Sequence, residues 1–133
     1  MVVNGHGGNY MLANVVQQAN ADGAMRVGLY PSREDWTEAR RAAGITSSNH
    51  DDMHAGELET SLLLAAHPAY VRDGTHTADH AAPNRRYLST LGIDAYATGG
   101  VIGWPSRADA DKGQAAIDHL GQAAGNFIAL LIK

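Results

Sequence analysis

The first third of the chain places apolar and polar positions in the order expected for a strand, a turn and a helix. Met1–Val3 is apolar and runs into a glycine-rich turn, which predicts a strand that ends there. Apolar positions then recur at helical spacing over residues 10–19, with Asn9 as the expected N-cap. The helix is expected to stop near Gly23.

The same order repeats immediately. Residues 25–30 predict a second strand, closed by Pro31. Ser32 is the expected cap of a polar helix that ends at Gly44. Two successive strand–helix units favour parallel strands.

The remaining two thirds contain two further helices and a long irregular stretch. Residues 57–66 predict a helix with leucines on more than one side, which we expect to be buried. Residues 73–86 show no periodicity and predict a surface loop. Residues 91–96 and 101–102 resemble short strands, and residues 109–132 predict a long amphipathic helix that covers a sheet.

Taken together, the pattern predicts the α/β class with a mainly parallel sheet. The 133 residues, 44% hydrophobic and 18% charged, suit one domain over residues 1–133. In such folds, ligand sites lie beyond the carboxyl ends of the strands. His6 stands at that position after the first strand.

Composition narrows the possible functions. The net charge is −4 and the ten Lys and Arg residues are scattered, so neither nucleic acid nor a membrane surface is an expected partner. No run approaches the roughly 20 apolar residues of a membrane span, and a cytoplasmic location is expected. Because cysteine is absent, a metal would have to bind to histidines and carboxylates.

The glycine-rich turn over residues 4–9 is one candidate site. A histidine on such a turn is free to bind a metal or transfer a proton, which makes His6 a candidate. A solvated histidine is the alternative. Backbone N–H groups at Gly7 and Gly8 binding a phosphate are another.

The acidic stretch over residues 51–61 is the second candidate. Glu57 by itself is explained by the preference for acidic residues in a first helical turn. Glu59 is followed by an apolar run and is expected to be buried, where a carboxylate requires a metal or a cation. The two carboxylates lie about 200° apart on a helical wheel, so one is expected to bind while the other orients.

His54 stands just before that helix and suits a general acid that protonates a leaving nitrogen, since histidine exchanges protons near neutral pH. An ordinary histidine at a helix entrance is the alternative. Trp36 and Trp104 are expected to pack in the core or to wall a small-molecule pocket. The other histidines are expected at the surface: His50, His67, His76, His80 and His119.

Two of these motifs coincide in one known family. Asn4–Asn9 reads N-G-H-G-G-N and His54–Ser61 reads H-A-G-E-L-E-T-S, and together they resemble the creatininase family of metal-dependent amidohydrolases. Residues 100–105, G-V-I-G-W-P, are similar to its closing segment. The resemblance implies a three-layer α/β/α sandwich, a two-metal centre of Zn or Mn, hydrolysis of a C–N amide bond and a homo-oligomer, often a hexamer.

The resemblance also implies site residues. His6 would be a metal ligand and His54 the proton-transferring residue. Creatininase proper has Glu where this chain has Gly8, so Glu59, or else Glu57, is expected to supply that carboxylate. We accordingly assign Glu59 to the metal and Glu57 beside His54 to catalysis, with Trp36, Gly7 and Gly8 as substrate-binding residues.

One family segment has no counterpart here. Members resemble one another in an earlier E-x-H-G segment followed by Asp, which supplies further ligands, and residues 1–133 contain none. The chain therefore resembles the C-terminal portion of a member, and we expect an N-terminally truncated protein. A catalytic zinc normally needs about three protein ligands plus water, so weak metal binding and little hydrolysis are expected of the isolated chain.

The leading functional hypothesis is an amidohydrolase acting on a small cyclic amide, a formamide or a modified peptide. The alternative is a catalytically incomplete fragment or assembly subunit. A sugar-phosphate or nucleotide binder that uses the turn at Gly7 and Gly8 is a third reading.

Overall fold

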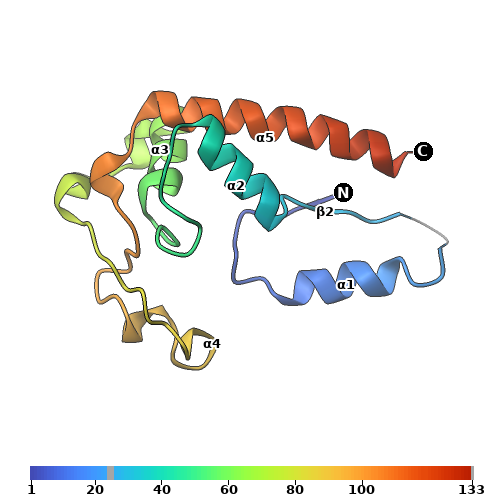
Figure 1. The fold of residues 1–133 in the computed structure, drawn as a ribbon, viewed down its shortest axis with the longest axis horizontal. Coiled ribbons are helices and arrows are strands. Elements are labelled where there is room, and N and C mark those ends of the chain that lie inside the picture. Colours follow the sequence, from blue (N-terminus) through green and yellow to red (C-terminus); the bar gives the residue numbers. More distant parts are fainter. Residues whose placement is uncertain (24–25, 133) are drawn as a thin grey trace.

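The computed structural model describes residues 1–23 and 26–132 (Figure 1). Its helices and strands are β1 (Val2–Val3), α1 (Met11–Ala19), β2 (Leu29–Tyr30), α2 (Arg33–Ala42), α3 (Glu57–Ala66), α4 (Leu88–Leu91) and α5 (Ala110–Leu131). Short 3-10 turns lie at Pro68–Tyr70, Thr75–Thr77, Ile93–Ala95 and Pro105–Arg107.

The sheet confirms the predicted α/β class and the parallel pairing. β1 and β2 run parallel, with Val2 opposite Leu29 and Val3 opposite Tyr30. Within the described residues the sheet has these two strands, fewer than the expected sandwich contains. The second strand was expected from residue 25, which lies outside the described residues.

The strand expected over residues 91–96 is wrong. The segment closes on itself: α4 ends at Leu91, Gly92 takes a φ of 74°, and a 3-10 turn follows. The backbone N–H of Tyr96 donates to the Ile93 carbonyl, so local turns satisfy groups that a strand would pair with a neighbour. The strand expected at 101–102 is reduced to single bridges, His54 with Ile102 and His80 with Gly103.

The expected helices are present, and their caps explain two of their ends. Ser32 begins α2 with a capping box: its hydroxyl accepts from the Asp35 N–H at 3.1 Å, and the Asp35 carboxylate accepts from the Ser32 N–H at 2.7 Å. Gly44, with a φ of 68°, lies just after its end, as predicted. The N-cap expected at Asn9 is wrong, because its side chain donates to Asn4 instead.

The hydrophobic core lies where α2, α3 and α5 pack together (Figure 1). Its buried members are Ala39, Ala43, Ile45, Leu58 and Ala116. Burial of α3 is confined to its first half, and Leu63 is exposed. The expectation of a wholly buried helix is therefore wrong, because α3 has no neighbour on that side among the described residues.

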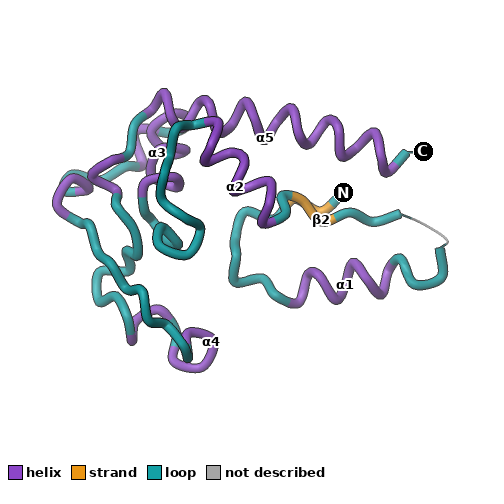
Figure 2. The backbone as a smooth tube through the Cα atoms, in the orientation of Figure 1, coloured by secondary structure: helices purple, strands orange, loops and turns teal. Residues whose placement is uncertain are grey.

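The long helix α5 covers the sheet, as predicted. The Tyr30 hydroxyl at the end of β2 donates to the Leu120 carbonyl at 2.6 Å, and its ring stacks on Phe127. Between α3 and α5 the backbone is mostly loop (Figure 2), which agrees with the loop predicted over 73–86. None of the helices in the described part of the chain combines the length and apolarity needed to cross a membrane.

Candidate functional site

His54 and Glu59 come together at the start of α3. The backbone of His54 is fixed by two hydrogen bonds with Ile102, at 3.0 and 2.9 Å. Its Nδ1 lies 3.7 Å from Glu59 Oε2, and the two side chains are 42% and 44% exposed. The pair is therefore preformed and open to solvent.

Glu59 departs from its expected burial. The same Oε2 atom accepts the Ala55 N–H at 2.6 Å, and Ala55 adopts a φ of 49° that folds the chain back toward the helix. That hydrogen bond fixes the carboxylate beside His54. The apolar run after Glu59 does not enclose it, because its face of the helix is open.

Glu57 is the buried carboxylate instead, with 4% of its surface exposed. Its Oε1 lies 2.7 Å from the Lys112 ammonium of α5, and Ser47 donates to its Oε2 at 3.4 Å. The cation that we expected a buried carboxylate to need is present, but it serves Glu57. The opposed placement of the two carboxylates agrees with their helical spacing.

Asp52 organises the surroundings of this site, and sequence reasoning missed it. Its carboxylate is buried and accepts from the backbone N–H groups of Glu57 at 2.6 Å and Leu58 at 3.1 Å, which caps α3. It also accepts from the Trp104 N–H and from Arg40, the latter at 2.8 Å. An aspartate shortly before a helix whose N-cap is a glycine, and so has no capping side chain, was the available signal.

The pKa of Asp52 reflects these contacts. Burial pushes the pKa upward, but hydrogen bonds from Arg40 and from three backbone N–H groups outweigh it and lower the pKa below its ordinary value. The carboxylate is accordingly held ionised.

Two glycines make room for that carboxylate. A Cβ at Gly56 would lie 1.8 Å from Asp52 Oδ1, and one at Gly103 would lie 2.2 Å from it. Gly103 also has a φ of 151°, which side chains disfavour. The buried aspartate therefore explains a glycine in each of two motifs, H-A-G-E and G-V-I-G-W-P.

The turn after β1 is separate from this site. His6 is exposed, and its backbone N–H donates to Asn4 Oδ1, which also accepts from Asn9. Gly7 and Gly8 are exposed as well. In Figure 1 the segment between β1 and α1 is drawn apart from α3, with the loop that follows α2 between them, so the two candidate sites are separate.

The implied metal does not fit the residues that the structure describes. Over residues 1–23 and 26–132, no group of three or more His, Asp or Glu side chains is placed to hold a metal ion. His6 and Glu59, the expected ligands, belong to the two separated segments. These residues alone therefore do not form the expected centre.

The remaining candidates are mostly engaged in packing. Trp36 is partly buried against the core, and Trp104 carries the guanidinium of Arg107 over its ring. His119 is partly buried, with 29% of its side chain exposed and Nε2 3.7 Å from Glu38 Oε2. His80 Nε2 donates a hydrogen bond to the Tyr96 carbonyl at 2.8 Å.

Comparison with known proteins identifies the family of this chain. The family model described as "Creatininase: Creatinine amidohydrolase" matches residues 1–128. The chain belongs to the creatininase family. The matched range includes both motifs and the bridge between His54 and Ile102, and the family agrees with the α/β class.

Curated relatives of this creatininase-family chain are peptidases by name. A "Mycofactocin precursor peptide peptidase" of Mycobacterium ulcerans (strain Agy99) is 35% identical over 116 residues, which is 84% of this chain and 40% of the relative. Proteins of the same name from Mycobacterium tuberculosis, strains CDC 1551 / Oshkosh and ATCC 25618 / H37Rv, are 34% identical over the same share. The chain thus spans 40% of the length of these relatives. No solved structure matches it.

Proposed function

We propose that this chain forms part of the active site of a metal-dependent amide hydrolase whose substrate is a peptide or modified peptide. The family description names an amidohydrolase, and the relatives' names specify a peptide substrate. One observation carries the proposal at the residue level: the open pair of His54 and Glu59, 3.7 Å apart at the start of α3.

The pair suits the proton transfer that amide hydrolysis requires. A leaving nitrogen must gain a proton, and His54 would donate it. Glu59 faces Nδ1 of the ring, which leaves Nε2 for the substrate. The gap of 3.7 Å is longer than a hydrogen bond, and such contacts commonly shorten when substrate binds.

For the metal centre, we propose only the ligands that this chain would supply. We propose that His6 and Glu59 are each ligands of Zn or Mn, and that further polypeptide supplies the other donors, because the two residues lie in separated segments of one chain. A second copy in a homo-oligomer is one source of them. Glu57 has Lys112 as its partner, so we propose that it stabilises the start of α3 rather than reacting.

The experiment measures cleavage of a panel of short peptides, with creatinine and N-substituted formamides alongside, by mass spectrometry in the presence of Zn or Mn. We expect slow peptide cleavage by the 133-residue chain and a loss of about 100-fold or more in His54→Gln. His67→Gln is the matched control, because His67 is exposed at the other end of α3. It should retain the rate.

Two results contradict the proposal. Cleavage that is unchanged in His54→Gln removes the assigned proton donor. No cleavage above the metal-free background by chains that retain the metal removes the catalytic function from this chain.

The second candidate is a non-catalytic assembly subunit. It is favoured by the absence of a group of three metal-binding side chains within the described residues. Folded, stable protein that fails to cleave any of the panel would support this candidate.

A further inference from the structure

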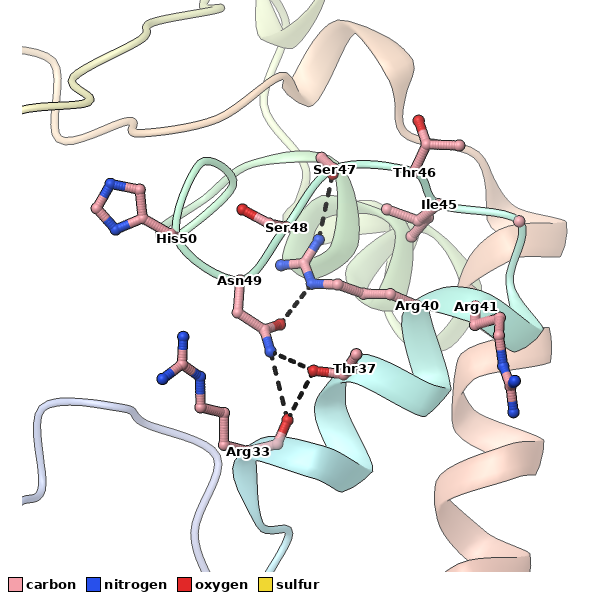
Figure 3. Close-up of a pocket in the computed structure, with 11 residues that line it drawn as sticks. Arg33, Thr37, Arg40, Arg41, Ile45, Thr46, Ser47, Ser48, Asn49 and His50 are labelled. Atoms are coloured by element: carbon pink, nitrogen blue, oxygen red, sulfur yellow. Dashed lines mark hydrogen bonds between the residues drawn. The ribbon is translucent and has the colours of Figure 1, made fainter.

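A polar hollow lies between α2 and the segment 44–50 (Figure 3). Its volume is about 520 Å³, within the range of small-molecule sites. It is lined by Arg33, Thr37, Arg40, Arg41, Gly44, Ile45, Thr46, Ser47, Ser48, Asn49 and His50. Positions 33, 37, 40, 41 and 44 form one stripe of α2 and its end, since they recur at helical spacing.

The lining is positively charged. It contains three arginines and no Asp or Glu. Arg40 is neutralised by Asp52 at 2.8 Å, and its side chain is buried. Arg33 and Arg41 are exposed, and no carboxylate among the described residues forms an ion pair with either guanidinium.

The floor of the hollow is fixed. The Asn49 amide donates to Thr37 Oγ1 at 2.9 Å and accepts from Arg40 Nε at 2.7 Å. His50 is held as well, because its Nε2 lies 3.0 Å from the Pro83 carbonyl and Arg85 donates to its backbone carbonyl at 2.6 Å. A ligand would therefore meet side chains that are already positioned.

The guanidinium of Arg33 is the one best placed for direct contact. Figure 3 shows it extending to the same side of Asn49 as the His50 ring, whereas Arg41 extends at the other end of the stripe. Asp51, which follows the lining residue His50, accepts from the Ser48 hydroxyl at 2.7 Å. It does not reach Arg33 as an ion partner.

We propose that this hollow binds an anionic group, a carboxylate or a phosphate, through Arg33, with Arg41 adding attraction from the far end. A guanidinium offers paired donors that match both oxyanions. The proposal does not depend on the proposed hydrolysis, because binding is measured without turnover.

The test is calorimetric titration of the 133-residue chain at low salt with three probes: inorganic phosphate, a short peptide with a free C-terminal carboxylate, and the same peptide as its C-terminal amide. We expect Arg33→Gln to weaken anion binding about tenfold and Arg41→Gln about twofold, since a distant charge is largely screened. Arg72→Gln is the matched control, because Arg72 is exposed and lies outside the hollow. It should leave binding unchanged.

The outcomes separate the sources of the anion. Binding of the acid peptide but not of phosphate identifies a carboxylate site, and the reverse identifies a phosphate site. Equal binding of the acid and amide peptides without phosphate binding overturns the proposal, as does a failure of all three probes to bind. Binding that Arg33→Gln leaves intact also overturns it, and circular dichroism confirms that each variant is folded.

Discussion

At the residue scale, the site depends most on a side chain that takes no part in the proposed chemistry. Asp52 joins α2 through Arg40, caps the first turn of α3, and receives the Trp104 N–H from the segment that pairs with His54. One carboxylate thus fixes the three pieces of backbone that position His54 and Glu59. Its two carboxylate oxygens accept from four described donors: Arg40 Nη1 and the backbone N–H groups of Glu57, Leu58 and Trp104. Arg40 also donates to the backbone carbonyl of Asp52.

Replacing Asp52 should therefore destabilise the whole fold. We expect Asp52→Asn to lower the free energy of unfolding by about 3–5 kcal/mol, because it leaves the Arg40 guanidinium buried without a counter-charge. Asp51→Asn is the control, since Asp51 is exposed and bonds only near itself. Urea unfolding at pH 7 measures both. Similar stabilities for the two variants would contradict the role of Asp52.

The lowered pKa of Asp52 predicts that the stability of the fold depends on pH. The pKa of Asp52 is lowered in the folded chain, although burial alone would raise it. An acid whose pKa falls on folding contributes stability above its unfolded pKa, near 4, and loses it as the pH drops through the folded pKa. Stability should thus decline below about pH 4. Asp52→Asn should flatten this decline, and Asp51→Asn should not.

At the scale of elements, sequence was informative wherever the causes were local. The helix after Ser32 followed from its cap and its glycine stop, and both were observed. The strand expected over 91–96 failed because a strand needs a partner from elsewhere, which alternation of apolar residues cannot supply. Local turns around Gly92 took its place.

In the candidate site, too, local features could be predicted from the sequence and contacts between distant residues could not. The motif over residues 54–61 indicated His54 and the two glutamates as candidates, because these residues are close together in the sequence. Which glutamate is buried depends on how α3 meets Lys112, more than fifty positions further along the chain. The contacts of Asp52 with Arg40 and Trp104 likewise depend on residues elsewhere in the sequence, so a local pattern could signal only its bonds to the start of α3.

Packing of α3 against α5 yields a prediction about a helical glycine. A Cβ at Gly113 would lie 1.9 Å from the Ser61 carbonyl oxygen, so the two helices meet where a side chain is missing. We expect Gly113→Ala to destabilise the fold by about 1–3 kcal/mol through overpacking. Thermal unfolding followed by circular dichroism measures the change.

Gly121 in the same helix is the matched control. Nothing lies within 4 Å of a Cβ placed there. Gly121→Ala should stabilise the chain by up to about 1 kcal/mol, because alanine favours a helix more than glycine does. Equal shifts of the melting temperature in the two variants would show that the close helix contact is absent.

At the scale of the whole molecule, the chain is unevenly packed. α2, α3 and α5 share the core, whereas α1 has no buried residue and both residues of β1 are exposed (Figure 1). Parallel strands are usually covered on both faces, and an isolated two-stranded sheet is only marginally stable. The turn that carries His6 therefore lies in a part of the described structure with few buried residues. Glu59 lies beside the hydrophobic core.

That separation predicts how the chain handles metal. After loading with Zn or Mn and exhaustive dialysis, we expect elemental analysis to find fewer than one ion per chain, because the described residues bring no three donors together and a tight site needs about three protein ligands. The mass of the same sample in solution shows whether chains have associated. About two retained ions per chain, the content of a two-metal centre, would contradict this expectation for a monomer. In an associated sample, that content would show that neighbouring copies complete the site, with His6→Ala then expected to release metal and His67→Ala to retain it.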